Sequence, residues 1–452
     1  MTSPRMTTRI ARAVRPEEVV YLVAPSGFPN YGDELIAATW LAHLRRTRPR
    51  ATVVLDCHTP GQASLLLRNA NPRAVFTDTL WRLTEHARAV AEREIDDDAV
   101  DPARPWEWVA AAASSLGVVP AHGEGVDLLL RASSLHLVGG GYVNRQWRHH
   151  TSLLVAMAAV GRQTGARVFA TGQGLLPLLE EPEWSALKKA LEGFDIVDVR
   201  DAASREALDG LALREGGRVT ASGDDVWLAL PQRRWGDRVI DELRRRRGAD
   251  PLPSGGVVLC LQSDLIEDFT FDGTTGVPAL ADYADATLRH WGVPPERVTV
   301  IEAIPGHDYT VVKELGDRLA GARIVPFLSV WRDGLPIGAG QTWLTTRFHP
   351  HLIAAAAGDS GAAVVTKPDY YGTKHASLVD CGSRWTVADG SSVPDRPAAG
   401  GFSPADRARN VDAKRALARE CYPPRSPRRR CGRRTTPNAG PAPGAPRQRR
   451  TR

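Results

Sequence analysis

Residues 341–374 read QTWLTTRFHPHLIAAAAGDSGAAVVTKPDYYGTK, and this stretch decides the fold that we expect. An apolar, β-prone run at 342–346 leads into Arg347-Phe348-His349, a helical pattern follows to Ala357, and a second apolar run covers 362–365. This order predicts a βαβ unit. Ligands of such units bind beyond the carboxyl ends of the strands, where Arg347 and His349 stand. A guanidinium suited to a carboxylate or phosphate therefore lies beside a side chain that can move a proton near neutral pH.

The same alternation of strand-like and helical segments runs through both halves of the chain. Strands are expected at 18–23, 52–55, 135–138, 168–171 and 196–199, and again at 257–261, 298–303 and 322–325. The pattern predicts an α/β fold with two doubly wound, Rossmann-like domains facing each other across a cleft. The expected divisions are an N-terminal extension, two domains joined by a linker, a partly helical extension and a tail: 1–17, 18–230, 231–235 (linker), 236–386, 387–420 and 421–452.

Composition places the chain among soluble globular proteins, because 42% of its 452 residues are hydrophobic and 24% are charged. We expect no membrane span and no secretory signal, since the sequence lacks a long uncharged apolar run and an N-terminal apolar segment. The five cysteines are scattered without CxxC pairs. That usage predicts a cytoplasmic protein without a structural zinc site.

The basic charge of the chain is concentrated in its C-terminal tail. Ten arginines and no acidic residue lie in 421–452, so the other 420 residues carry about −4 of the net +6. Specific nucleic-acid binding by the folded part is therefore not expected. The tail should be disordered, because it has too few apolar residues to form a core. It could associate weakly with anionic lipid at the inner face of the membrane, bind RNA nonspecifically, or be a solvated extension.

Glycine-rich segments follow two successive predicted strands, and an arginine follows the next. Gly139-Gly140-Gly141 and Gly172-Gln173-Gly174 could let a ligand approach the backbone closely, or could serve tight turns. Arg200 stands at the corresponding place after the third strand. It either meets an anion or forms a salt bridge with Asp198 or Asp201. The pattern predicts one ligand-facing rim.

The loop after the first strand contains Asn30 and Asp33, at the start of a predicted helix. It does not match the GxGxxG fingerprint. Asp33 can cap the helix or contact a ligand hydroxyl, since a carboxylate would repel an anion placed there. A further acidic run at 92–98 fits no EF-hand loop and is expected to be a solvated loop or helix end.

Six motifs, taken in order, resemble those of the polysaccharide pyruvyl transferase family. They are Asn30-Tyr31-Gly32-Asp33-Glu34, Gly139-Gly140-Gly141, Gly172-Gln173-Gly174, Val199-Arg200-Asp201 with Ser204, Arg347-Phe348-His349, and Tyr371 with Lys374. The resemblance covers residues 18–385. It implies a fold similar to GT-B glycosyltransferases. It also implies transfer of the pyruvyl group of phosphoenolpyruvate to two hydroxyls of a sugar in a cell-surface or exopolysaccharide precursor, giving a pyruvate ketal.

The resemblance also implies roles for individual residues. His349 matches the position of the proposed general acid, which would protonate the methylene carbon of phosphoenolpyruvate. The cations Arg347 and Lys374 of the C-terminal half, which is the donor side, would bind the donor together with Arg200 of the N-terminal half. The acceptor sugar would lie against the N-terminal half, next to Asn30, Asp33, Gly140, Gly141 and Gln173. No metal and no other cofactor is implied.

Three positions depart from the family pattern. Gln262 stands where members commonly carry an arginine, Ser222-Gly223-Asp224-Asp225 lacks the usual Asp-Pro, and Pro350 replaces a small residue. Loss of the arginine could alter the donor or the acceptor. Two alternatives therefore remain open: a GT-B glycosyltransferase whose arginines hold the diphosphate of a nucleotide-sugar, and a non-catalytic sugar-binding protein of the same fold.

Overall fold

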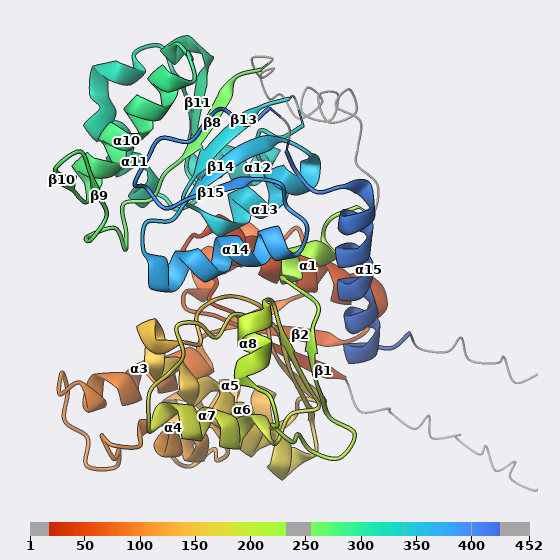
Figure 1. Cartoon of the computed structure of the whole chain (residues 1–452). Helices are drawn as coiled ribbons and strands as arrows, with labels where there is room; N and C mark the ends of the chain where they lie inside the picture. The colour runs from red at the N-terminus through yellow and green to blue at the C-terminus, as the bar shows by residue number, and fades with distance from the viewer. Residues whose placement is uncertain (1–17, 232–254, 339, 399, 425–452) are drawn as a thin grey trace, which may run out of the picture.

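The computed structural model describes residues 18–231, 255–338, 340–398 and 400–424, which form two α/β lobes (Figure 1). The expected N-terminal extension and nearly all of the expected linker lie outside the described residues. So do a helix expected at 237–247 and the tail from residue 425 onward. No helix in the described ranges is long and apolar enough to cross a membrane.

The N-terminal lobe is built on a seven-stranded parallel sheet in the order β3-β2-β1-β4-β5-β6-β7. Alternate residues of β1 enter different cores, Val20 and Leu22 on one face and Tyr21 on the other. Both faces are thus covered, as parallel sheets require. The strands are β1 Val19–Val23, β2 Thr52–Asp56, β3 Val75–Thr77, β4 Ser134–Leu137, β5 Arg167–Gln173, β6 Ile196–Val199 and β7 Arg218–Ala221.

Helices of this lobe divide between the two faces of the sheet. Residues of α1 and α2 share a core with Val20 and Leu22, whereas α3, α4, α6 and α7 share one with Tyr21. The helices are α1 Tyr31–Thr47, α2 Pro60–Leu67, α3 Thr79–Ala91, α4 Pro105–Ala113, α5 Gly123–Leu130, α6 Thr151–Thr164, α7 Glu183–Leu191 and α8 Ala202–Ala207. The acidic run after α3 is largely exposed, as expected, and its Glu94 pairs with Arg88.

The C-terminal lobe contains a six-stranded parallel sheet in the order β12-β11-β8-β13-β14-β15. The predicted βαβ unit is confirmed as β13 Thr342–Thr345, α13 Phe348–Ala357 and β14 Ser360–Val364. The other strands are β8 Val257–Cys260, β11 Val298–Ile301, β12 Arg323–Val325 and β15 Thr386–Ala388, with a hairpin of β9 Thr270–Phe271 and β10 Thr274–Thr275. The other helices are α10 Val277–His290, α11 His307–Leu315, α12 Phe327–Asp333 and α14 Thr373–Asp380.

The last helix of the described residues, α15 Pro404–Cys421, runs beside both lobes and ends at the N-terminal one (Figure 1). Its apolar residues Val411 and Leu417 join the core that also holds Val20 and Leu22. Cys421 and Tyr422 are buried, and the Tyr422 hydroxyl lies 3.0 Å from Nδ1 of His136. The expected tail therefore begins too early at residue 421, because these two side chains complete the core of the N-terminal lobe.

Candidate functional site

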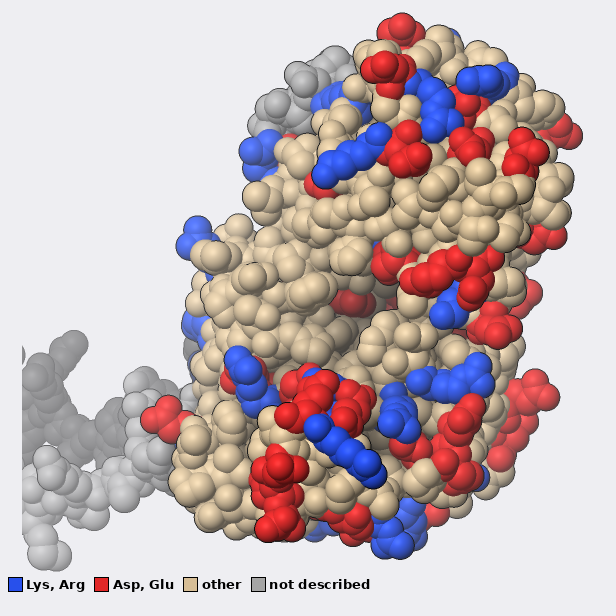
Figure 2. All heavy atoms as spheres, turned by 90° about the vertical axis from the view of Figure 1, so that its left-hand side faces the viewer, with Lys and Arg blue, Asp and Glu red and all other residues tan. Residues whose placement is uncertain are grey.

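A cavity of about 700 Å³ lies between the lobes, and the molecule is visibly hollowed there (Figure 2). Its walls come from α3, from segments that follow β1, β2, β4 and β6 in one sheet, and from segments that follow β8, β11, β13 and β14 in the other. The volume is ordinary for a small-molecule site. Seven of the residues predicted from the sequence line it: Asn30, Asp33, Gly141, Arg200, Arg347, His349 and Lys374.

Gly140 and Gln173 do not line this cavity, contrary to the expectation that they contact an acceptor. They pair with each other behind its wall. The Gln173 amide donates to the carbonyls of Val138, at 2.9 Å, and Thr171, at 2.8 Å. Gln173 is only 2% exposed. Its hydrogen bonds to these carbonyls therefore hold the backbone of the rim in place.

Glycines of the rim accommodate Arg200. A Cβ on Gly141 would lie 2.7 Å from its Nη2, and one on Gly174 would lie 2.5 Å from its Nε. Both distances are shorter than a methyl group tolerates. These two glycines therefore make room for a side chain, where the sequence suggested room for a ligand.

Arg200 is buried, and not all of its N–H groups have a hydrogen-bond partner. Its guanidinium lies over the ring of Phe348, with 4.7 Å between Cζ and the ring centroid. The nearest carboxylates are Asp201, 3.8 Å from Nε, and Asp224, 3.9 Å from Nη1. Nε has no hydrogen-bond partner. Of the two predicted salt bridges, the one to Asp201 exists only as this loose contact. A buried donor without a partner costs free energy, which an anionic ligand would recover.

Lys374 stands next to Arg200 and is only 9% exposed. Its Nζ lies 3.2 Å from the ring centroid of Tyr370, and no carboxylate of the described residues forms an ion pair with it. Burial and the charge of Arg200 hold the pKa of Lys374 well below its usual value, although Asp33 opposes this. The lysine would regain a stable positive charge if an anion bound beside it.

Arg347 is already paired with two carboxylates. Its Nε donates to Oδ1 of Asp308 at 2.9 Å, and its Nη1 and Nη2 donate to Asp264 at 3.2 and 2.5 Å. Burial would lower the pKa of Arg347, but Asp308 and Asp264 raise it well above its usual value. The Asp308 side chain is 0% exposed, whereas that of Asp264 is 29% exposed. Asp264 thus occupies the place at which we expected a substrate anion.

His349 lies at the junction of the two lobes. Its Nε2 is 3.4 Å from Oδ2 of Asp224, whose pKa burial would raise but the charges of His349 and Arg200 lower. On the other side of the ring, a Cβ on Gly32 would lie 1.7 Å from Nδ1. The imidazole therefore lies between the carboxylate of Asp224 and the first turn of α1, which both belong to the N-terminal lobe.

Asp33 lines the cavity close to these groups. Burial raises its pKa to about 6, while the positive charges of His349 and Lys374 pull it down. The prediction that Asp33 caps the helix is wrong, because α1 begins two residues earlier. Asn30 is the cap, and its Oδ1 accepts a hydrogen bond from Gly32 N at 3.1 Å. Asp33 is consequently free of a capping role.

Sequence reasoning missed the carboxylates Asp224, Asp264 and Asp308. Asp264 and Asp308 follow β8 and β11 closely, so the rule that ligands meet strand ends could have found them. Gln262, the departure from the family pattern, is buried and donates through Nε2 to the carbonyl of Asp264 at 2.6 Å. The loop at this position therefore presents a carboxylate to Arg347.

The cavity combines groups suited to binding an anion and moving protons. Arg200 supplies positive charge, and Lys374 adds to it when an anion binds beside it. His349 brings an imidazole, and Asp33, whose pKa burial raises to about 6, can accept a proton. Among the described residues no cluster of three or more His, Cys, Asp or Glu side chains could hold a metal ion.

Fold and site together define a two-domain α/β architecture of the GT-B type, with a cation-rich cavity between the domains. The family model for polysaccharide pyruvyl transferases matches residues 30–358, and the chain belongs to this family. Membership makes the protein a sugar-modifying transferase. A search of curated proteins found no match.

The chain resembles solved structures of other proteins in fold. One is the UDP-GlcNAc 2-epimerase of Neisseria meningitidis, with a TM-score of 0.47 and 10% identity, covering 90% of this chain and 93% of that one. Another is the UDP-forming α,α-trehalose-phosphate synthase of Burkholderia vietnamiensis, with a TM-score of 0.41 and 12% identity, covering 90% and 91%. A likeness this distant says nothing about the substrate.

Proposed function

We propose that the protein transfers the pyruvyl group of phosphoenolpyruvate to two hydroxyls of a sugar in a polysaccharide precursor. The observation that carries the proposal is the pair of incompletely satisfied cations, Arg200 and Lys374, beside His349 in one cavity. Phosphoenolpyruvate has a carboxylate and a phosphate, so two cations suit it. The expected setting is the cytoplasm, where the donor and the precursor of a cell-surface or exopolysaccharide would meet.

The chemistry can be assigned to residues already in place. Protonated His349 gives a proton to the methylene carbon, and the adjacent carbon becomes electrophilic. A first sugar hydroxyl attacks that carbon and passes its proton to Asp33. A second hydroxyl attacks as the bond to the phosphate oxygen breaks, and its proton returns to His349. Inorganic phosphate leaves, and the proton on Asp33 is lost to solvent or to the phosphate.

Arg347 then has a different role from the one implied by resemblance alone. Because Asp308 and Asp264 neutralise it, its first function is to hold the loops after β8 and β11 against α13. It can bind the donor only when the partly exposed Asp264 withdraws. Arg200 and Lys374 are the first donor contacts in this scheme.

Calorimetric titration of phosphoenolpyruvate tests the donor site. We expect saturable binding that Arg200→Gln weakens at least about tenfold, since a charge-assisted hydrogen bond is lost. Arg205→Gln is the matched control, because Arg205 is partly exposed on α8 and pairs with Asp209. Equal binding by both variants would contradict the assignment, and binding of a nucleoside diphosphate alone would favour the glycosyltransferase alternative.

A transfer assay with His349→Ala tests the reaction itself. Loss of ketal formation with phosphoenolpyruvate binding retained is the expected result, because a general acid acts in the transition state. A variant that still transfers pyruvate at the wild-type rate would remove His349 from the mechanism. Sugar binding without turnover by the wild type would support the non-catalytic alternative.

A further inference from the structure

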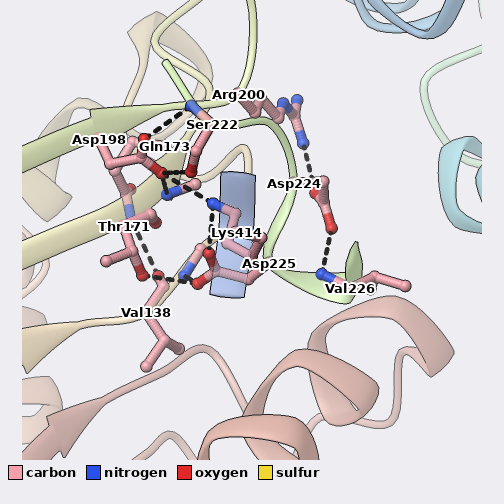
Figure 3. Close-up of polar contacts among 12 residues, drawn as sticks. Val138, Thr171, Gln173, Asp198, Arg200, Ser222, Asp224, Asp225, Val226 and Lys414 are labelled. Atoms are coloured by element: carbon pink, nitrogen blue, oxygen red, sulfur yellow. Dashed lines mark hydrogen bonds and ion pairs between the residues drawn. The ribbon is translucent and has the colours of Figure 1, made fainter. Parts of the chain in front are cut away.

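A buried lysine ties the C-terminal helix to the N-terminal lobe. Lys414 of α15 is 0% exposed, and its Nζ lies 2.8 Å from Oδ2 of Asp198 and 2.9 Å from Oδ1 of Asp225 (Figure 3). Burial would lower the pKa of Lys414, but the two carboxylates raise it. A buried charge is tolerated only with such partners, so this contact is specific in position and in sign.

Asp225 is fixed by further contacts on its other oxygen. Oδ2 accepts hydrogen bonds from Trp40 Nε1 at 2.7 Å, Gly139 N at 2.9 Å and Thr171 Oγ1 at 2.6 Å. A Cβ on Gly139 would lie 2.9 Å from this carboxylate, and one on Gly172 would lie 2.8 Å from it. The first glycine of each rim motif therefore makes room for Asp225.

Asp198 binds Ser222, at the start of the segment 222–225 that ends with Asp225. Its Oδ1 accepts from Ser222 N at 2.8 Å, and its Oδ2 accepts from Ser222 Oγ at 2.9 Å and from Gly172 N at 3.0 Å. Lys414 lies between Asp198 and Asp225 (Figure 3). Lys414 thus contacts one end of the segment 222–225 directly at Asp225, and is linked to the other end, Ser222, through Asp198.

Asp224 lies within this segment and faces the cavity side. Its Oδ1 accepts from Val226 N at 2.9 Å, and its Oδ2 is 3.4 Å from His349 and 3.9 Å from Arg200. Asp225 and Asp224 are consecutive, so a shift of the first moves the second. A misplacement of about 1 Å at a catalytic group can cost about a hundredfold in rate.

We infer that Lys414 is a positioning residue for the reaction: through Asp225 and then Asp224, α15 sets the orientation of His349 and Arg200. This inference rests on the proposed function for its catalytic consequence. Its structural part, the attachment of segment 222–225 by Lys414, can be tested without turnover. Nothing in the sequence around Lys414 indicates the link, because its partners are 216 and 189 residues away.

Hydrogen–deuterium exchange tests the attachment. Lys414→Met keeps the length of the side chain and removes its charge, and Arg415→Met, which loses a contact with the Leu230 carbonyl, is the matched control on the same helix. Faster exchange of the amides of 222–228 in Lys414→Met, absent from Arg415→Met, is the expected result. Faster exchange confined to α15 would overturn the inference.

A double-mutant cycle tests the catalytic consequence. We expect Lys414→Met to lower kcat by about tenfold or more while KM for phosphoenolpyruvate changes less than about threefold, and to have almost no effect in an Asp224→Asn background. Independent, multiplicative losses would overturn the link. If Lys414→Met does not fold, Lys414→Met with Asp198→Asn removes one unpaired buried charge and serves in its place. An inactive wild type would refute the proposed function and leave the exchange result to decide the attachment.

Discussion

Arg347 and Arg200 differ in what surrounds each guanidinium. Arg347 is held by Asp308 and by the partly exposed Asp264, whereas Arg200 has only carboxylates at 3.8 and 3.9 Å and an unpartnered Nε. Both arginines follow a strand and look alike in the sequence. Arg200 is thus better able to bind an anion than Arg347, because Arg347 is already paired. In the proposed reaction, the balance of nearby carboxylates would decide which of the two arginines meets the donor first.

Removing the charge of Asp264 should strengthen donor binding. In Asp264→Asn one carboxylate no longer competes for Arg347, so the Kd for phosphoenolpyruvate should fall on the order of tenfold. Calorimetry measures the change. Asp268→Asn, an exposed position in the same loop, is the control. Weaker binding by Asp264→Asn would show that Asp264 supports the site and does not compete within it.

The pH dependence of transfer should report Asp33. A base acts when deprotonated, and burial raises the pKa of Asp33 to about 6, so kcat/KM should rise with pH through about 6. Asp33→Asn should lose this limb and about a hundredfold or more in rate. Glu34→Gln is the control, since burial raises the pKa of Glu34 to about 7 although it does not line the cavity. If the rise of kcat/KM with pH is retained in Asp33→Asn, the base must be a residue other than Asp33.

The sequence after each predicted strand showed which residues could belong to the site. It did not show which of these residues contact one another. Arg347 and His349 follow β13 in a local pattern that the sequence displays. Asp264 and Asp308 follow β8 and β11, and they reach Arg347 because the sheet places its strands in the order β11-β8-β13. Strand order depends on packing between distant segments, so the neutralisation of Arg347 is not visible in the sequence.

At the scale of elements, the two lobes meet where α1 begins and α13 begins. Gly32 in the first turn of α1 lies against the ring of His349 in α13. The absence of a side chain is what permits this approach. The helices were predictable from their periodicity, but their contact was not, because they belong to different lobes.

Gly32→Ala should therefore impair the reaction while leaving the fold intact. The new methyl group would overlap the imidazole, so His349 must move, and a loss on the order of a hundredfold in kcat is expected. Gly61→Ala in α2 is the control, because a Cβ there meets nothing within 4 Å. Kinetics and thermal unfolding of both variants make the comparison. Normal turnover by Gly32→Ala would show that the imidazole of His349 can move away without loss of activity.

At the scale of the whole molecule, the last described residues of the chain lie against the lobe that contains the first described ones. After the C-terminal lobe is complete, α15 returns to the N-terminal lobe, and Tyr422 contributes to a core that includes Trp40 and Phe169. The sequence predicted a helix here but assigned it to an extension. The local sequence does not show that this helix packs against the N-terminal lobe, because the residues that it contacts there lie far away in the chain.

Truncations should separate the helix from the residues that follow it. A chain ending at Pro424 is expected to unfold within about 2 °C of the full-length protein, whereas one ending at Ser403 should not form a stable N-terminal lobe, since it lacks Lys414 and the buried Val411, Leu417 and Tyr422. Calorimetric scans and near-UV circular dichroism make the comparison. A cooperative transition in the shorter chain would contradict this role for α15.

The return of α15 also sets an order of events during synthesis. Lys414 leaves the ribosome 189 residues after Asp225. At roughly 5–20 residues per second, the N-terminal lobe waits about 10–40 seconds for the ammonium that neutralises its two buried carboxylates. The N-terminal lobe, although it is made first, is thus completed only after the strands of the C-terminal lobe have been made. Until Lys414 has been made, Asp198 and Asp225 must remain hydrated, and we expect the rim of the cavity that they support to be assembled only afterwards.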